Sequence, residues 1–126
     1  MSVRSAKELV VYRKGFELAM NVFEVSKSFP AEERFALTSQ IRRSSRSVCL
    51  NLHEAWAKRR YPAHFLSKLT DSDGNSETDS SLDFAKACGY ISADRHAELT
   101  ALCAEIGRML GSMIHRFEPF LLPPDR

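Results

Sequence analysis

The feature that most constrains the fold of this chain is an apolar stripe near its C-terminal end. Apolar side chains recur there at steps of four, three, four, three and four, at Leu99, Cys103, Ile106, Leu110, Met113 and Phe117. Because an α-helix turns every 3.6 residues, this spacing places all six side chains on one narrow helical face, as in coiled coils. Such a face is stable only when other helices bury it, so the stripe predicts a helical bundle.

Corners that contain proline or glycine divide the rest of the chain. The pairs Phe29-Pro30 and Tyr61-Pro62 each end a helix, because the residue before proline avoids the helical conformation. Gly89 is a typical helix C-cap, and Ser92 is a typical N-cap. We therefore predict helices over residues 5–28, 31–60, 63–88 and 93–117, followed by an apolar, proline-rich tail over 118–126, which needs a docking place on its own bundle or a neighbouring one.

Four helices with short connections predict an all-α fold, an up-down-up-down antiparallel four-helix bundle. With 126 residues, the chain is expected to form a single domain over residues 1–126. In the first helix, Ser5 and Glu8 have the spacing of a capping box. The expected seam of that helix is Leu9, Tyr12, Phe16, Ala19, Phe23 and Ser26.

The third predicted helix is weak in its middle. The run Asp71-Ser-Asp-Gly74-Asn-Ser combines poor helix formers, so intrinsic propensity favours a turn there. Only tertiary packing could hold this stretch helical.

The second helix has two distinct faces. Its apolar residues Leu37, Ile41, Val48, Leu52 and Ala55 share one arc and are expected in the core. Arg42, Arg43 and Arg46 share a separate arc, and Leu50 lies on that same side. Guanidinium groups bind phosphate oxygens in a bidentate manner, so this arc is a candidate anion-binding face. Leu50 is unusual on a solvated face and indicates a protein partner.

Charge is segregated along the chain, although the net charge is only +2. Residues 42–60 hold six bases and one acid, whereas residues 71–83 hold five acids and no base. Two interpretations remain open. The bases of residues 42–60 bind phosphate, or they pair with the acidic third helix, within the bundle or across subunits.

The fourth helix has more apolar and small surface than one seam requires. Ala104, Gly107, Gly111 and Ile114 lie beside its core stripe. We expect them to form a second close contact, with another subunit.

No set of residues typical of a catalyst, cofactor site or metal centre is found. Cys49 and His53 are four residues apart on one helical face, but no second pair of zinc ligands lies nearby. The run that begins at Asp71 starts like a calcium loop, but it has Ser76 and Leu82 where that loop requires glycine and glutamate. Three widely spaced cysteines, with no signal peptide or membrane-spanning run, favour a reducing cytoplasm.

Several segments taken together resemble one family. They are the first helix with Phe29-Pro30, Leu37-Thr-Ser-Gln-Ile-Arg-Arg43, Asn51, Glu54-Ala55, Phe65-Leu-Ser-Lys-Leu69, Glu77-Thr78, Cys88-Gly-Tyr-Ile-Ser92 and Glu105-Ile-Gly-Arg-Met-Leu110. The chain resembles the small four-helix-bundle proteins that are encoded in intervening sequences of bacterial 23S ribosomal RNA genes. That family also includes the accessory protein of diversity-generating retroelements, which binds nucleic acid and a reverse transcriptase.

The resemblance implies a homopentameric barrel with basic surfaces and no known enzymatic activity. The recurring arginines of the family correspond to Arg42 and Arg43, and its basic segment to Lys58, Arg59 and Arg60. We therefore expect a non-enzymatic, oligomeric protein that binds nucleic acid, RNA or DNA, or acts as an adaptor. Its sequence-independent phosphate contacts would come from Arg42, Arg43, Arg46, Lys58, Arg59 and Arg60. The alternative is a protein-interaction scaffold whose arginines serve the subunit interface.

Overall fold

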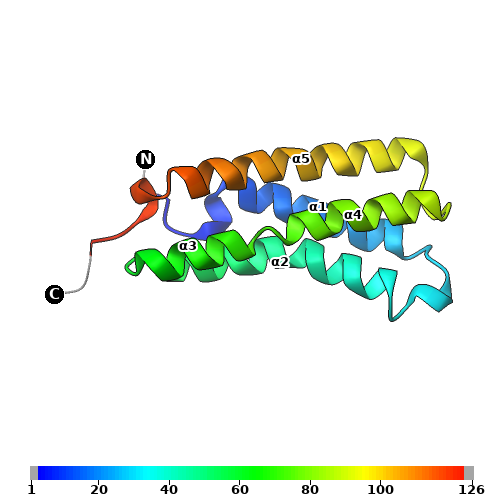
Figure 1. Cartoon of the computed structure of the whole chain (residues 1–126), viewed down its shortest axis with the longest axis horizontal. Coiled ribbons are helices and arrows are strands. Elements are labelled where there is room, and N and C mark those ends of the chain that lie inside the picture. The colour runs from blue at the N-terminus through cyan, green and yellow to red at the C-terminus, as the bar shows by residue number, and fades with distance from the viewer. Residues whose placement is uncertain (1–2, 124–126) are drawn as a thin grey trace.

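The computed structural model describes residues 3–123, which form helices and no strand (Figure 1). The α-helices are α1 (Val10–Ser26), α2 (Leu37–Ala57), α3 (Pro62–Asp71), α4 (Gly74–Ala87) and α5 (Ala93–His115). Three short 3-10 helices lie between or beyond them, η1 (Ala6–Glu8), η2 (Ala31–Glu33) and η3 (Glu118–Phe120). Because α3 and α4 follow each other along one arm, the chain has the four arms of a four-helix bundle.

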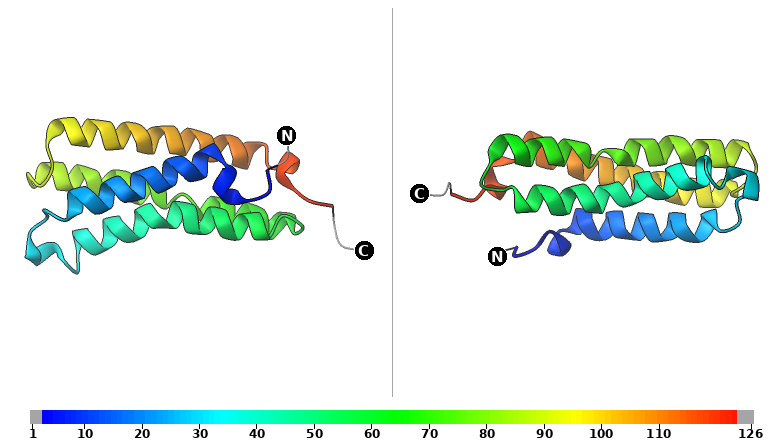
Figure 2. Two further views of the ribbon diagram at one scale, coloured as in Figure 1. Left: turned by 180° about the vertical axis from the view of Figure 1, so that it is seen from behind. Right: turned by 90° about the horizontal axis from the view of Figure 1, so that it is seen from below.

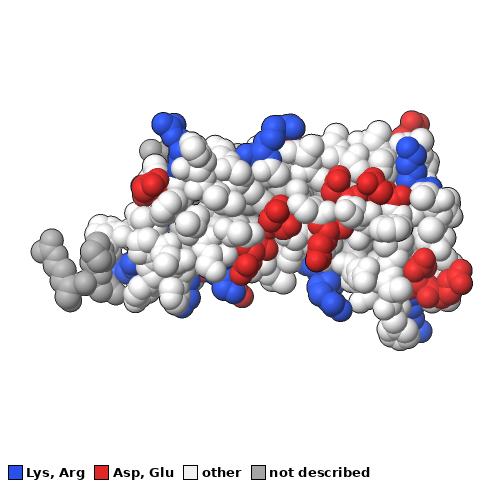
Figure 3. Space-filling view, in the orientation of Figure 1, with Lys and Arg blue, Asp and Glu red and all other residues white. Residues whose placement is uncertain are grey.

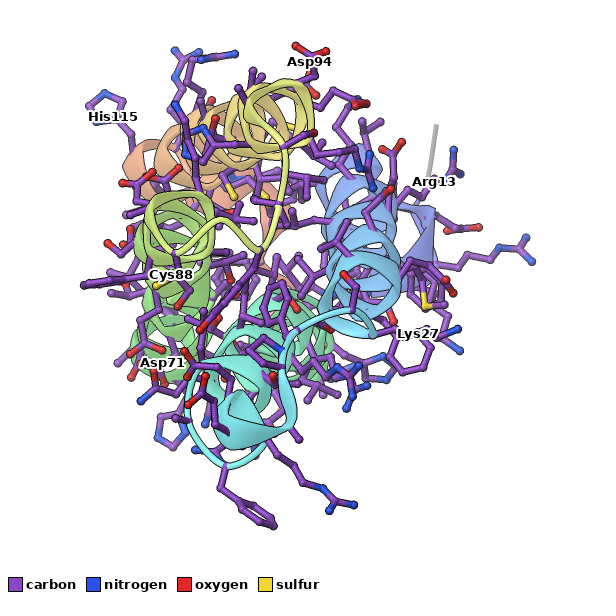
Figure 4. The ribbon with its side chains drawn as sticks, turned by 90° about the vertical axis from the view of Figure 1, so that its right-hand side faces the viewer. Arg13, Lys27, Asp71, Cys88, Asp94 and His115 are labelled. Carbon is purple, nitrogen blue, oxygen red and sulfur yellow. The ribbon has the colours of Figure 1, made fainter. Side chains whose placement is uncertain are left out.

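The four arms run alternately up and down, as predicted (Figure 2). Helix α1 packs against α2 and α5, α2 packs against α3 and α4, and α4 packs against α5. Seen along the bundle axis, α1, α2, α4 and α5 occupy the corners of a square (Figure 4). The side formed by α1 and α2 is therefore opposite the side formed by α4 and α5.

The core stripes predicted for α2 and α5 are confirmed. Leu37, Ile41, Val48, Leu52 and Ala55 of α2 are buried. On α5, Leu99, Cys103, Ile106, Leu110 and Met113 are buried, and Phe117 packs half-buried against the same core. These side chains meet Leu18, Phe65 and Leu82 from the other arms, none of which is measurably exposed.

The seam predicted for the first helix is confirmed only in part, since Ser26 is buried and Leu9 and Tyr12 pack half-buried against the core. The buried residues are Val11, Gly15, Leu18, Val22 and Ser26, and Phe16 is 55% exposed. Close packing against α2 explains the difference, because a Cβ on Gly15 would lie 2.8 Å from Cγ1 of Val48. The glycine side of α1 therefore faces α2, and the bulkier apolar stripe beside it is left partly uncovered.

The start of the first helix also differs from the prediction. Ser5 and Glu8 do form the capping box, but they cap η1 rather than α1. Leu9 has an extended backbone, with ψ of 137°, so the long helix begins only at Val10.

Two of the predicted helices are interrupted. The segment predicted as 31–60 contains η2, a turn at residues 34–36 and then α2. The helix predicted over 63–88 is broken at Ser72 and Asp73, within the stretch of poor helix formers. The low helix propensity of these residues therefore interrupts the helix, although the arm is packed in the bundle.

The apolar tail docks on its own bundle. The Phe120 ring lies 6.3 Å from the Trp56 ring and 6.5 Å from the Phe65 ring, between centroids. The backbone N–H of Leu122 donates a hydrogen bond to the carbonyl of Arg59, at 3.0 Å. Residues 124–126 of the predicted tail lie outside the described part of the chain.

Candidate functional site

Arg42 is part of the contact between α1 and α2. Its Nε donates a hydrogen bond to Oγ of Ser26 at 2.7 Å, and its guanidinium lies 4.8 Å from the centroid of the Phe23 ring. A second, longer hydrogen bond runs from Nη2 to the carbonyl of Phe23, at 3.5 Å. The half-buried Arg42 therefore contributes to the packing of α1 against α2. Of the three arginines predicted to form one exposed face, only Arg43 and Arg46 are exposed.

Arg43 and Arg46 are exposed on α2. Together with Ser39, Arg42 and Leu50 they line a shallow hollow of about 340 Å³. Within residues 3–123, neither Arg43 nor Arg46 has a carboxylate within ion-pair distance. Arg43 makes only a long hydrogen bond, 3.4 Å, to Oγ of Ser39. The predicted pairing of these arginines with the acidic arm does not occur within the subunit.

Apolar side chains are also exposed on α2 and on the neighbouring helix α1. Leu50 is 63% exposed, one turn from Arg46 on the same helix. On α1, Phe16 and Met20 are 55% and 47% exposed, on the flank that leads through Phe23 to Arg42. We define the α1–α2 face as Phe16, Met20, Arg43, Arg46 and Leu50. The apolar pattern of α1 is visible in the sequence, but its periodicity assigns Phe16 to the core, so this part of the face was missed.

The bases at the end of α2 lie apart from that face. Arg59 stacks on Trp56, with 4.0 Å between its guanidinium and the ring centroid, and donates a hydrogen bond to the Trp56 carbonyl at 3.0 Å. Burial, with Arg60 beside it, lowers the pKa of Arg59. Lys58 and Arg60 are exposed. At about 1.5 Å per residue, Lys58 lies roughly 18 Å along the helix from Arg46, so the six predicted bases do not form one continuous row.

The opposite side of the bundle carries a second hollow, between α4 and α5. Its volume is about 370 Å³, and its lining residues are Asp73, Asn75, Ser76, Asp79, Ser80, Cys103, Ala104 and Gly107. Figure 3 shows acidic side chains in a band along α4, with basic side chains below them over α2. Of the residues predicted at a subunit interface, Ala104 and Gly111 are exposed and Gly107 and Ile114 are half-buried. We call the hollow lined by Asp73, Asp79, Ala104 and Gly107 the α4–α5 groove.

Asn75 leaves an unpaired acceptor beside this hollow. Its Nδ2 donates a hydrogen bond to the carbonyl of Cys103 at 2.7 Å, and the residue is only 4% exposed. Because a carbonyl can only accept, this bond fixes the orientation of the amide. Oδ1 is then buried without a donor. The local sequence around Asn75 does not predict this hydrogen bond, since Asn75 and Cys103 lie 28 residues apart in the chain.

The residues considered for metal or nucleophilic chemistry are not brought together. The Cys49 thiol is buried and donates to the carbonyl of Tyr12, and burial raises its pKa to about 11. Burial also raises the pKa of Cys103, to about 12. His53 is exposed, and no group of three metal-binding side chains occurs in the part of the chain that the structure describes. None of the helices described is long and apolar enough to span a membrane.

Comparison with known proteins gives one family. A family model described as 23S rRNA-intervening sequence protein matches residues 7–112. A crystal structure from Bacteroides thetaiotaomicron, of a protein of unknown function from the S23 ribosomal protein family, is similar in fold, with a TM-score of 0.75 and 28% sequence identity. The similarity covers 84% of this chain and 96% of that one. No curated protein matches the chain, and the expected relation to the retroelement accessory protein stays a prediction.

Proposed function

Since this chain belongs to the family of 23S rRNA-intervening sequence proteins, we propose that it is a non-enzymatic, self-assembling scaffold that binds other protein surfaces through its α1–α2 face. The family resemblance implies a homopentamer, and a homo-oligomer of any subunit number could act as such a scaffold. The observation that carries the proposal is the mixture of exposed apolar side chains and unpaired arginines on the α1–α2 face.

The composition of this face is typical of a protein interface. Aromatic residues, methionine and arginine are enriched in such interfaces, and arginine and aromatic anchors often dominate the binding free energy. Phe16, Met20 and Leu50 are each about half exposed or more. A surface that bound only phosphate would need the arginines but would gain nothing from these three side chains. The apolar component therefore favours protein over nucleic acid as the ligand.

Nucleic-acid binding is the second candidate, supported by a different observation. Arg43, Arg46 and Lys58 are exposed and form no ion pair within residues 3–123, so their charges are available to phosphates. Such contacts would be independent of sequence and would weaken steeply with salt. Against this candidate, Arg42 and Arg59 are engaged in packing, and the net charge is only +2.

Light scattering on the purified protein tests both candidates. It measures the mass of the wild type, whose subunit is 14.3 kDa, with and without a short structured RNA at low and moderate salt. The double variant Arg43→Glu/Arg46→Glu reverses the two exposed charges of the face. Lys7→Glu/Arg34→Glu is the matched control, because both residues are exposed basic positions that are not part of the α1–α2 face.

If the protein is such a scaffold, we expect the wild type to have the mass of an oligomer that does not change when RNA is added. We expect Arg43→Glu/Arg46→Glu to be monomeric and the control variant to stay oligomeric. If the double variant stays oligomeric but loses RNA, the nucleic-acid candidate is correct. A wild type that is monomeric at every concentration contradicts the scaffold.

A further inference from the structure

The C-terminal tail, of which residues 118–123 are described, lies on the rest of the protein as a bound peptide lies on its receptor. After α5 ends at His115, the tail lies at the end of the bundle where α2 ends and α3 begins (Figure 1). Leu121 is extended, with ψ of 147°, and the N–H of Leu122 donates a hydrogen bond to the carbonyl of Arg59 at 3.0 Å. Receptors for extended peptides use the same combination of main-chain hydrogen bonds and pockets for side chains.

Phe120 is the anchor of this contact. Its ring stacks on Phe65, with 23° between the ring planes, and meets Trp56 edge-on, at 62°. Such aromatic pairs add to the free energy that is gained from burial alone. Phe65 is fully buried, and Trp56 is half-buried. Because Trp56 belongs to α2 and Phe65 belongs to α3, the bundle provides the receptor surface and the tail provides the ligand.

The tail fills its site incompletely. A hollow of about 380 Å³ remains between tail residues 119–122 and the bundle residues Trp56 and Arg59, with Val3 beside them. Leu121 is half-buried, and Leu122 is 36% exposed. A segment with a larger side chain at this point would gain contacts with Trp56 and Arg59 that the tail does not make. The site therefore has room for a better ligand than the tail.

The tail also lies outside the part of the chain that is shared with the family. The family model matches residues 7–112, which end before the tail begins. Of the buried core residues that the structure describes, Met113 alone lies beyond residue 112. The tail is therefore an addition to a bundle whose core is nearly complete without it.

We propose that the end of α2 and the start of α3 form a peptide-binding site, which the chain's own tail occupies until a segment of a partner protein displaces it. The ligand is an extended apolar segment of the same chemistry as the tail, in which an aromatic residue is followed by two leucines and flanked by prolines. Prolines favour the extended conformation and so reduce the entropy that is lost on binding. The inference goes beyond the scaffold function, because Trp56, Arg59 and Phe65 are not part of the α1–α2 face.

Binding of a labelled peptide to the full-length protein tests the site. The probe is a fluorescein-labelled peptide with the sequence of residues 117–123, Phe-Glu-Pro-Phe-Leu-Leu-Pro. In the opened variant, Phe120→Ala/Leu122→Pro, the tail lacks the anchor ring and the N–H that binds Arg59. Leu121 already has the backbone conformation that precedes a proline, so the second substitution does not strain the chain. Glu118→Ala/Pro123→Ala is the matched control, since both residues are exposed.

We expect the peptide to bind the opened variant at least about tenfold more tightly than the wild type or the control, as measured by fluorescence anisotropy. The reason is that a site occupied by its own tail about nine-tenths of the time has an apparent affinity for a competitor about tenfold lower. If the opened variant does not bind the peptide, or if the wild type binds it equally tightly, the proposal is wrong. A peptide with alanine at the position of Phe120 is expected to bind at least about tenfold more weakly, and equal binding would place the peptide outside this site.

Trp56 provides a second measurement, because it is the only tryptophan of the chain. In the opened variant its ring loses the contact with Phe120, so we expect its fluorescence emission at a longer wavelength than in the wild type. Addition of the unlabelled peptide is expected to return the emission toward the wild-type wavelength. An opened variant whose emission equals that of the wild type, with and without peptide, contradicts the proposal.

Circular dichroism first compares the helix content of all variants with that of the wild type. If the opened variant is less helical, the single variant Leu122→Pro takes its place, with Leu122→Ala, which keeps the N–H, as its control. The same increase in peptide affinity is then expected for Leu122→Pro, and equal affinities of the two variants contradict the proposal. Because no residue of the α1–α2 face is changed, the peptide site and the scaffold function fail separately.

Discussion

Gly74 faces Ser47 across the contact between α4 and α2, with no room for a side chain between them. A Cβ on Gly74 would lie 1.9 Å from Oγ of Ser47 and 3.0 Å from the carbonyl oxygen of Ser44. The hydroxyl of Ser47 already donates to that carbonyl, at 2.7 Å. Gly74 is the first residue of α4, so this contact sets how closely the second half of the arm approaches α2.

We expect Gly74→Ala to destabilise the protein, although alanine is the better helix former. Forcing a methyl group into a filled contact typically costs about 1–3 kcal/mol. Gly111→Ala is the matched control, because nothing lies within 4 Å of its added Cβ. In that position we expect a gain of about 0.5–1 kcal/mol from helix propensity. Both substitutions are introduced into the variant Arg43→Glu/Arg46→Glu, which is expected to be monomeric, and the free energy of unfolding is measured by urea denaturation. Equal effects of the two substitutions would contradict the close contact at Gly74.

A second prediction concerns the buried hydroxyl pair between α2 and α4. Oγ of Ser44 and Oγ1 of Thr78 are 2.8 Å apart, and both residues are buried. Thr78→Val removes this contact and the bond of the Thr78 hydroxyl to the carbonyl of Gly74, and it leaves the Ser44 hydroxyl with only its longer bond, 3.3 Å, to the carbonyl of Ile41. We expect this change to cost about 1–2 kcal/mol. In Ser44→Ala/Thr78→Val both polar groups are gone, so part of that loss is expected to return. Additive effects in this double-mutant cycle, measured by urea denaturation, would show that the two hydroxyls do not interact.

The core stripes could be predicted from sequence where a helix has one apolar face. Leu99 and Ile106 lie on such a face, and both are buried as expected. Helix α1 has two adjacent apolar stripes, and periodicity alone cannot choose between them. The choice depends on the close approach of Gly15 to Val48, which is a tertiary contact between residues 33 positions apart in the chain.

The candidate site could be predicted only in part, for a related reason. Arg43 and Arg46 are exposed, as the helical phase of α2 indicates. Arg42 shares their arc, but its partner Ser26 lies 16 residues away in a different helix, so its burial could not be read from the pattern of α2. The unpaired oxygen of Asn75 likewise depends on a bond to a distant helix, α5.

The two buried thiols predict a decline in stability at alkaline pH. Burial raises the pKa of Cys49 from the ordinary cysteine value of 9.0 to about 11, and it raises that of Cys103 to about 12. Above pH 9 the unfolded chain loses these protons while the native state keeps them, so the unfolded state binds fewer protons. The contribution of the neutral thiols is therefore fully present below pH 9 and is lost as the pH rises toward 11 and 12.

Denaturation at several pH values between 8 and 11 checks this expectation against Cys49→Ala/Cys103→Ala. The variant is expected to be less stable at pH 8 because it loses buried volume, but its stability should fall less steeply above pH 9. If the free energy of unfolding falls equally steeply with pH in the variant and the wild type, these thiols have the same pKa in the native and unfolded states, which would contradict the prediction. Cys88 is the internal reference for reactivity, since it is exposed and is expected to react first with an alkylating reagent at pH 8.

Arg42 and Arg43 are adjacent in sequence but are expected to respond oppositely to substitution. Arg42→Ala removes a 2.7 Å hydrogen bond to Ser26 and the stacking on Phe23, so it should lower the free energy of unfolding by about 1–2 kcal/mol. Arg43 has no comparable contact, and Arg43→Ala should change that free energy by less than about 0.5 kcal/mol. Assembly, measured by light scattering, should show the reverse, with the larger loss for Arg43→Ala. If Arg42→Ala is as stable as the wild type and is the variant that fails to assemble, Arg42 turns outward in solution and belongs to the binding surface.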